Sequence, residues 1–187
     1  MNPLLLDFPT MFQTKRLQLR KPFPGDGSEL YEVYQRSASD LNSWLSYGAA
    51  IQSEDQAEAD VREAHAKFLM REQLRFHLYV KEDNTFIGSI TLQPVDWDIR
   101  NFEVSCWLAS DARHKGYMTE ALTGSIKFAF EKLQCNRLEI RCDSRNEDAR
   151  QLAERTGFIL EGTLHKNCKA LNSDDLCDTC IYAKIKE

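Results

Sequence analysis

The feature that most constrains the fold is a strand, a loop and a helix in direct succession near the middle of the chain. Residues 102–108 alternate apolar and polar side chains, which is typical of a strand with one buried face. After a polar loop over residues 110–116, apolar residues recur at three- and four-residue spacing and predict an amphipathic helix. These apolar positions are Met118, Leu122, Ile126, Ala129, Phe130 and Leu133. A helix of this kind must pack its apolar face against the strand and its neighbours.

Elements on both sides of this unit predict an α/β protein with a mixed sheet. Asp26 to Glu29 and Ser53 to Gln56 are capping-box patterns, which predict helices over residues 27–36 and 54–69. A further helix is expected over residues 147–155, with Gly157 at its C-terminal cap. Strands are expected over residues 14–20, 76–81, 85–92, 137–142, 158–164 and 176–185. Because no repeat or linker is visible, one domain over residues 1–187 is expected.

Composition narrows the class of protein. The 187 residues are 42% hydrophobic and 28% charged, which is typical of a globular chain. A formal net charge of −5 argues against a general nucleic-acid binder, because neutralising phosphates requires a basic surface. No apolar run approaches the roughly 20 residues of a membrane helix, and the N-terminus lacks signal-peptide features. A cytoplasmic location with mostly reduced cysteines is therefore expected.

The six cysteines fall into two groups. Cys106, Cys135 and Cys142 lie among apolar residues and are interpreted as small core residues. The C-terminal segment carries H-x-x-C followed by C-x-x-C, formed by His165, Cys168, Cys177 and Cys180. Such a set could hold zinc in a tetrahedral site. The alternative is a strand, on which residues three apart point to opposite faces, and on this reading no metal is expected.

The loop before the central helix has features of an anion-binding site. Arg113, His114 and Lys115 supply positive charge, and Gly116 permits close approach of the backbone. Helix N-termini favour phosphate because their N–H groups are unpaired and carry partial positive charge. The alternative is a solvated loop with a turn glycine. Neither G-x-x-x-x-G-K-[ST] nor G-x-G-x-x-G occurs in the sequence, which argues against nucleotide-dependent phosphoryl transfer and Rossmann oxidoreduction.

Several stretches together resemble the GNAT acetyltransferases, and within them the RimJ/RimL type of ribosomal-protein N-terminal acetyltransferase. Arg113-x-x-Gly116-x-Met118 is similar to the Q/R-x-x-G-x-G/A pyrophosphate loop of that family. The matching stretches follow the family's order and spacing over nearly the whole chain. They are TKRLQLR at 14–20, FIGSI at 86–90, EVSCWL at 103–108, GYMTEA at 116–121 and GFILEG at 157–162.

The resemblance implies a GNAT-like fold with one mixed, mostly antiparallel sheet, in which two neighbouring strands splay apart. It also implies acetyl-CoA as the acetyl donor. The pantetheine arm would pair with the end of the strand over residues 102–108, and backbone N–H groups after it would bind the pyrophosphate. The cofactor-binding residues implied are Trp107, Leu108, Arg113, His114, Lys115, Gly116, Tyr117, Met118, Thr119 and Asn146.

Two residues depart from the family pattern. Met118 replaces the last small residue of the loop, but its backbone N–H remains, so phosphate binding is expected to persist. Ala149 replaces the serine of N-x-x-S, a proposed general acid for the departing thiolate in related enzymes. Tyr117, Ser144 and Tyr182 are other candidate proton donors, each with a structural role as the alternative.

Glu103 is the predicted general base or amine-orienting group. It matches a glutamate of the family strand and points away from the apolar face, where the alternative is a solvent-facing side chain. An α-amine has a pKa of roughly 7.7–8.0 and a lysine side chain about 10.4, so a carboxylate working through water suits the α-amine better. Trp44 and Tyr47 match a region that borders the acceptor cleft in relatives, with ordinary core packing as the alternative.

The sequence therefore predicts an acetyl-CoA-dependent N-acetyltransferase that acts on a primary amine, with the N-terminus of a ribosomal protein as the leading acceptor. A small amine such as an antibiotic, a polyamine or an amino sugar is the alternative acceptor. A non-catalytic acyl-CoA-binding module and a zinc-stabilised interaction domain are alternative functions. Neither nucleic acid nor membrane is expected as a partner, and the resemblance leaves a homodimer open.

Overall fold

A mixed sheet runs through the computed structural model, which describes residues 2–44, 51–171 and 173–186. Over these residues the sheet has eight strands in the order β1-β2-β3-β4-β5-β6-β8-β7, and each neighbouring pair is antiparallel except β5 and β6. The strands are β1 (Met11–Gln13), β2 (Leu17–Arg20), β3 (Leu74–Val80), β4 (Phe86–Asp96), β5 (Asn101–Leu108), β6 (Arg137–Asp143), β7 (Ile159–Lys169) and β8 (Leu176–Ile185). The predicted mixed, mostly antiparallel sheet is confirmed.

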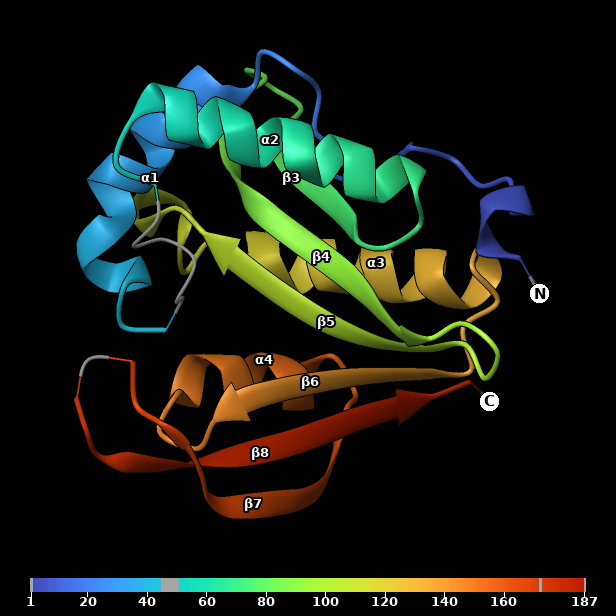
Figure 1. The fold of residues 1–187 in the computed structure, drawn as a ribbon, viewed down its shortest axis with the longest axis vertical. Coiled ribbons are helices and arrows are strands. Elements are labelled where there is room, and N and C mark those ends of the chain that lie inside the picture. Colours follow the sequence, from blue (N-terminus) through green and yellow to red (C-terminus); the bar gives the residue numbers. More distant parts are fainter. Residues whose placement is uncertain (1, 45–50, 172, 187) are drawn as a thin grey trace.

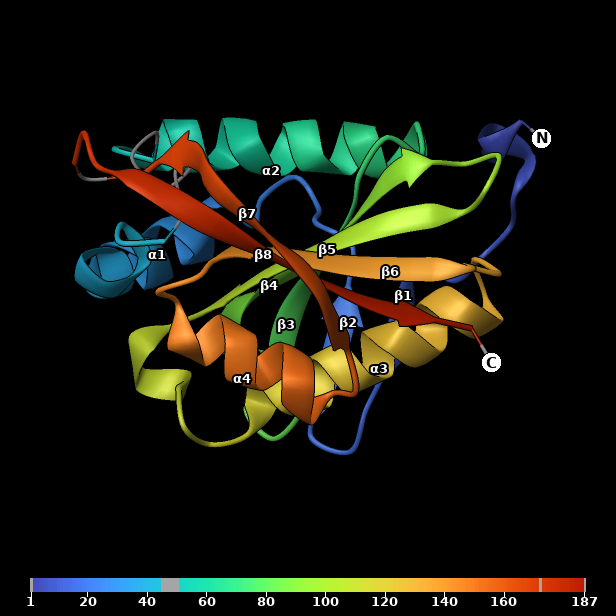
Figure 2. The same cartoon turned by 90° about the horizontal axis from the view of Figure 1, so that it is seen from below.

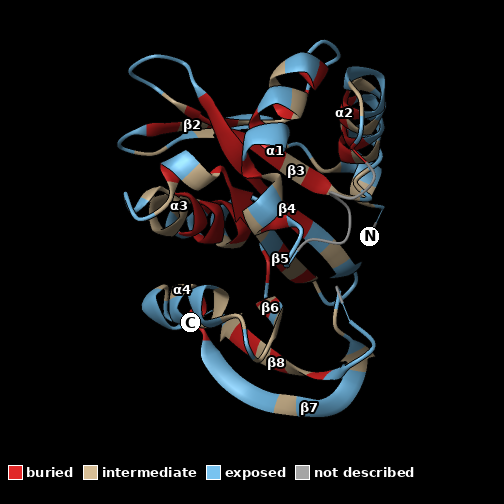
Figure 3. Cartoon of the chain, turned by 90° about the vertical axis from the view of Figure 1, so that its left-hand side faces the viewer, coloured by how far each residue is buried: buried red, intermediate tan, exposed pale blue. Residues whose placement is uncertain are grey.

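The helices cover the two faces of the sheet in pairs (Figure 2). One pair is α1 (Gly27–Leu41) and α2 (Glu54–Leu69), and the other is α3 (Tyr117–Glu131) and α4 (Glu147–Arg155). Short 3-10 turns are η1 (Pro3–Leu5) and η3 (Ser110–Ala112). Buried residues concentrate in the central strands and on the inner face of α3, whereas β7 is largely exposed (Figure 3). The core is therefore densest around β3, β4 and α3.

Strands β5 and β6 separate along their length. They pair only over residues 101–103 and 137–139, and the last pair is Glu103 with Glu139. Beyond that pair β5 continues to Leu108 and β6 to Asp143, and the two strands diverge (Figure 1). The predicted splayed pair is thus present, and Glu103 lies where the strands begin to part.

The edge of β5 that faces the splay offers backbone groups to a ligand. Ala109 N–H donates to the carbonyl of Ile87 in β4 at 2.8 Å, so this residue directs its backbone toward β4. Backbone groups of successive strand residues alternate in direction, so Cys106 and Leu108 direct theirs toward the opening. An extended, amide-containing chain can pair with such an edge as an added strand does.

One predicted strand start and one predicted helix cap need correction. The strand predicted over residues 14–20 is a turn at its beginning, because Thr14 N–H donates to the Leu17 carbonyl at 2.9 Å and closes a hairpin between β1 and β2. Ser53 caps α2 as predicted and accepts from Gln56 N at 3.2 Å. Asp26 also precedes its helix, but its carboxylate forms no capping bond.

The Asp26 carboxylate is instead part of a buried polar cluster. It accepts two hydrogen bonds from Arg20, at 2.7 and 2.9 Å, and one from Phe23 N at 2.8 Å. His77 Nδ1 lies 3.4 Å from it, and the imidazole is 1% exposed. Burial alone would raise the pKa of Asp26, but interactions with His77 and Arg20 outweigh it and hold that pKa well below its usual range. Burial lowers the pKa of His77, with partial compensation from Asp26.

This cluster predicts a loss of stability in mild acid. Because the pKa of His77 is lower in the folded than in the unfolded state, its contribution is fully present above about pH 6.5 and is lost progressively as pH falls from there through the lowered pKa of the folded state. The slope for one such group is at most about 1.4 kcal/mol per pH unit. We expect His77→Leu to flatten the decline of the melting temperature between pH 7 and pH 5. Asp26 acts only below about pH 4, because its pKa is also depressed. Parallel melting curves for the two proteins over this range would contradict the assignment.

The cysteines differ from expectation in two respects. Cys168 and Cys177, opposite each other in the β7–β8 hairpin with Cα atoms 5.4 Å apart, form a disulfide rather than two free thiols. Cys135 is buried as predicted, whereas Cys106 and Cys142 are only partly buried, because both lie where β5 and β6 separate. Within the residues described, no helix combines the length and the apolar character needed to cross a membrane.

Candidate active site

The turn that begins α3 has the backbone form of an anion-binding site. Gly116 is the N-cap residue and adopts a left-handed conformation with φ of 77°, and His114 is also left-handed with φ of 59°. Glu120 N–H donates to the Gly116 carbonyl at 3.1 Å and closes the first helical turn. The N–H groups before it are those that a helix leaves without intrahelical partners. They lie just after the end of β5, at the open end of the splay.

The connection from β5 to this turn is anchored by the C-terminal half of α1. Ser110 N–H donates to Ser37 Oγ at 3.1 Å, and Ser110 Oγ donates to the Asp40 carboxylate at 2.5 Å. Arg113 Nη1 lies 3.9 Å from the same carboxylate. The start of the loop is therefore held against α1. Arg113 lies near Asp40 of α1 and is also one of the predicted cofactor-binding residues.

The predicted cofactor residues from Trp107 to Thr119 lie in this region, whereas Asn146 follows β6, the other strand of the splay. Trp107 and Leu108 are buried at the end of β5, and His114 and Lys115 are exposed. Arg113, Tyr117, Met118 and Thr119 are partly buried in the turn and the first residues of α3. Asn146 is the N-cap of α4, and its Oδ1 accepts from Ala149 N at 3.1 Å. Its side-chain oxygen is thus already used within the fold, and its amide N–H₂ is the group left for a ligand.

Glu103 is partly buried at the apex of the splay. Burial raises its pKa above the usual value; the positive charge of Arg141 opposes this rise and the negative charge of Glu139 adds to it. A carboxylate with a raised pKa is a stronger base than an exposed one. Its position and its pKa both suit proton transfer.

A cavity of about 310 Å³ lies between α2 and the sheet, and its lining includes residues of β5 that follow this glutamate in the strand. Trp107, Ser105 and Glu103 occupy alternate positions of β5, opposite Ser89, Thr91 and Gln93 of β4, and therefore share one face. Among the described residues, the lining from β5 begins at Ser105, two residues after Glu103. The lining residues are Asp60, Glu63, Ala64, Lys67, Gln73, Arg75, Ser89, Thr91, Ser105, Cys106 and Trp107.

The charges that line the cavity are paired. Asp60 is paired with Arg75 at 2.5 Å and Glu63 with Lys67 at 2.6 Å, so its charged wall is balanced. The indole Nε1–H of Trp107 is fully buried and has no hydrogen-bond partner within the described part of the chain. Leaving such a group unpaired costs roughly 1–3 kcal/mol.

The other predicted residues divide as follows. Trp44 follows α1 with 41% exposure and does not contribute to the cavity as described, and Tyr47 lies outside the described residues. The Tyr182 hydroxyl donates to Glu154 at 2.9 Å and accepts from Arg150 at 3.3 Å, both on α4. It therefore stabilises the contact of β8 with α4, which supports the structural interpretation of that tyrosine.

The four residues that could have formed a zinc site make other interactions in the structure. Cys168 and Cys177 are bonded to each other, and His165 Nδ1 lies 2.9 Å from Asp178. Cys180 Sγ is buried beside Thr163 Oγ1 at 3.8 Å. In the described ranges, no three His, Cys, Asp or Glu side chains are grouped as a metal site would require.

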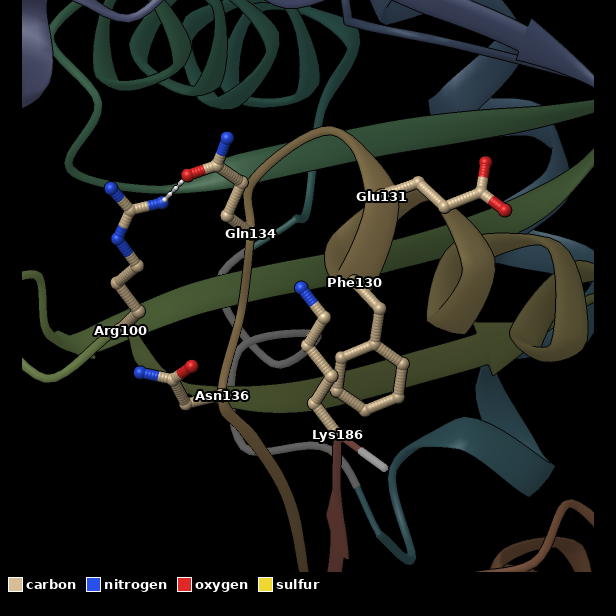
Figure 4. A pocket seen from close by; sticks show the side chains of 6 residues that line it. All are labelled: Arg100, Phe130, Glu131, Gln134, Asn136 and Lys186. Atoms are coloured by element: carbon tan, nitrogen blue, oxygen red, sulfur yellow. Dashed lines mark hydrogen bonds between the residues drawn. The ribbon is translucent and has the colours of Figure 1, made fainter.

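A larger depression lies at the opposite end of β5. It measures about 510 Å³ and is open and polar, and Arg100 donates to Gln134 Oε1 at 2.7 Å within it (Figure 4). Its lining comes from the end of α3, the start of β5 and β6, and Lys186. Because this is the end where β5 and β6 are paired, the depression has no access to the splay.

Two groups of site residues were not identified from the sequence. The first is the wall of the cavity on α2 and β3, exemplified by Asp60 and Arg75, which no local motif marks. The second is Arg16 with Glu120, which joins the β1–β2 turn to the start of α3. The stretches TKRLQLR and GYMTEA contain Arg16 and Glu120 and carried the family resemblance, but neither stretch indicates that the two residues meet.

The chain is similar in sequence to known acetyltransferases. The model of the acetyltransferase (GNAT) domain matches residues 16–159. The ribosomal-protein-serine acetyltransferase of Escherichia coli (strain K12) is 27% identical over 176 residues, which are 94% of this chain and 96% of that protein.

Solved structures agree with the observed fold. The microcin C7 self-immunity acetyltransferase, in complex with acetyl-CoA and AMP, superposes with a TM-score of 0.87 at 20% identity, over 96% of this chain and 98% of that one. A ribosomal L7/L12 α-N-protein acetyltransferase in complex with coenzyme A also gives 0.87, at 17% identity over 94% and 97% of the two chains. These likenesses confirm the predicted fold.

Proposed function

The chain belongs to the acetyltransferase (GNAT) domain family, and from this premise we propose that it acetylates the N-terminal α-amine of a protein. Family membership confirms the predicted class, an N-acetyltransferase that uses acetyl-CoA. The protein acceptor is the part that we propose. It is supported by the full-length similarity to a ribosomal-protein-serine acetyltransferase and by the site described above.

The observation that carries the proposal is the opening between β5 and β6, with the Gly116 turn at its open end and Glu103 at its apex. The free backbone edge of β5 suits an amide-containing arm, and the helix N-terminus suits the diphosphate next to it. Cys106, whose backbone faces the opening, also lines the cavity under α2, so donor and acceptor would meet at this part of β5.

The chemistry of the site favours direct transfer. When bound, acetyl-CoA would supply a thioester carbonyl. The amine nitrogen would bond to its carbon, the carbon–sulfur bond would break, and the coenzyme A thiolate would leave and take up a proton from water. Glu103 accepts the proton that the amine loses, directly or through a water molecule. Burial raises the pKa of Cys106 to about 12 and that of Cys142 to about 11, so both thiols stay protonated at neutral pH. An acetyl-cysteine intermediate at either position is therefore disfavoured.

The pKa of the acceptor amine determines whether a carboxylate base can deprotonate it. An α-amine with a pKa of roughly 7.7–8.0 is partly neutral at physiological pH, whereas a lysine side chain near 10.4 is not. This difference favours a peptide N-terminus.

The volume of the cavity supports a second candidate. About 310 Å³ is near the lower end of the range for small-molecule sites, so a small amine would also fit. The two acceptors are distinguished by incubating the enzyme and acetyl-CoA with peptides that start with Ser, Ala or Met, each with an internal lysine, and with spermidine and an aminoglycoside. Mass spectrometry locates the acetyl group. We expect it on the α-amine of a peptide, and acetylation confined to the small amines or to lysine would contradict the proposal.

A further inference from the structure

The turn between β1 and β2 is attached to the first turn of α3 by a single carboxylate. Glu120 accepts hydrogen bonds from Thr14 Oγ1 at 2.6 Å, from Arg16 N at 2.6 Å and from Arg16 Nε at 2.7 Å. Its side chain is only 18% exposed. Segments more than 100 residues apart in sequence are thereby held at a fixed distance, right at the proposed diphosphate site.

The guanidinium of Arg16 also reaches the loop itself. Its Nη1 donates to the carbonyl oxygen of Lys115 at 2.9 Å, and its Cζ lies 4.4 Å from the centre of the Tyr117 ring. A β-carbon built on Gly116 would be 3.5 Å from Nη2. Arg16 thus contacts the residues on both sides of Gly116 while its Nε remains bonded to Glu120.

The bond to the Lys115 carbonyl determines where the next N–H points. The structure contains no cis peptide bond within its described residues, and in a trans peptide the C=O and the following N–H point in opposite directions. Since the Lys115 carbonyl points at Arg16, the Gly116 N–H points away from Arg16. The side chain of Arg16 therefore fixes the direction of one of the N–H groups available to an anion.

We propose that Arg16, held by Glu120, is a positioning residue that orients the Lys115–Gly116 peptide for the diphosphate of coenzyme A. This inference rests on the proposed donor site. Arg16 acts through the backbone of the loop, and the carboxylate of Glu120 fixes the guanidinium in the orientation that this requires.

The test compares two donors that differ in the diphosphate. We expect Arg16→Ala to raise the KM for acetyl-CoA by about 10-fold or more, the effect of losing a hydrogen bond to a charged group, with kcat little changed. With acetyl-pantetheine, which lacks the diphosphate, the same variant should behave as the wild type does. A general loss of structure would instead impair both donors equally, and that result would overturn the proposal.

Two more variants separate positioning from charge. Arg16→Lys keeps the charge but cannot bond Glu120 and Lys115 together, so it should be nearly as impaired as Arg16→Ala. Glu120→Gln removes an anion from a helix N-terminus, which on electrostatics alone would strengthen phosphate binding. Positioning predicts the opposite, weaker binding of coenzyme A in calorimetry. Wild-type affinity in Arg16→Lys, or tighter binding in Glu120→Gln, would overturn the inference.

Arg62→Ala is the matched control, because it also removes an arginine from an ion pair, at 2.7 Å from Glu58, on the outer surface of α2. Its KM for acetyl-CoA should not change. If the wild type itself fails to bind coenzyme A, the proposed donor site fails. If the wild type binds and the Arg16 variants match it, only the positioning role fails.

Discussion

Glu103→Gln is expected to lower kcat by about 100-fold or more and to leave the KM for acetyl-CoA little changed, because general-base catalysis contributes about that factor. The amide has nearly the same shape but cannot accept a proton. In the wild type, kcat/KM should fall as pH drops through the pKa of Glu103, which burial raises above its usual value. Steady-state rates between pH 5 and pH 9 measure both effects. The variant should lack the fall due to Glu103 and keep only the fall caused by protonation of the acceptor amine, whose pKa is roughly 7.7–8.0.

Glu139→Gln is the control, because Glu139 lies directly opposite Glu103 and is also partly buried. It accepts from Arg137 Nε at 2.7 Å and from Asn101 Nδ2 at 3.3 Å, so its role is structural. Its negative charge raises the pKa of Glu103, so the substitution should move the acid limb to lower pH and preserve the maximal rate. Near-normal rates in Glu103→Gln would remove that residue from the mechanism.

Gly116→Asp is expected to weaken coenzyme A binding by about 100-fold or more, which calorimetry measures directly. The substitution strains a residue with φ of 77° and puts a negative charge where the diphosphate would lie. The structure offers a matched control in Gly25, which also has positive φ, at 103°, and where an added β-carbon would meet no atom within 4 Å.

Gly25→Asp should lower the melting temperature through backbone strain and leave coenzyme A binding intact. The comparison separates the cost of strain, about 1–2 kcal/mol at either site, from repulsion at the loop. Equal affinity in the wild type and in Gly116→Asp would show that the turn does not contact the diphosphate.

Local patterns in the sequence predicted most elements of the fold. The alternation at residues 102–108 and the apolar spacing after Met118 correspond to β5 and α3, because burial on one face imposes a period on the sequence. Ser53 was recognised as a cap because its hydroxyl bonds within its own helix. Asp26 has the same local pattern, but Arg20 and His77, which are distant or unmarked in sequence, recruit its carboxylate.

The sequence predicted those parts of the site that lie within one continuous segment of the chain. The Gly116 turn and Glu103 lie within continuous motifs, whereas the cavity wall and the Arg16–Glu120 contact require residues far apart in the chain to meet. The cysteines show the same limit. The expected redox compartment favoured free thiols, but the hairpin register places Cys168 opposite Cys177. No local sequence pattern predicts which residues of the two strands of this hairpin pair with each other.

Amide hydrogen exchange with and without acetyl-CoA tests the central claim most directly, because it reports which backbone N–H groups the ligand covers. We expect the ligand to slow exchange at residues 104–108 of β5 and at residues 114–119 of the turn. Exchange around Arg100 and Lys186, in the larger depression, should not change. Unchanged exchange in both of the first two segments at saturating ligand, or protection confined to that depression, would contradict the account.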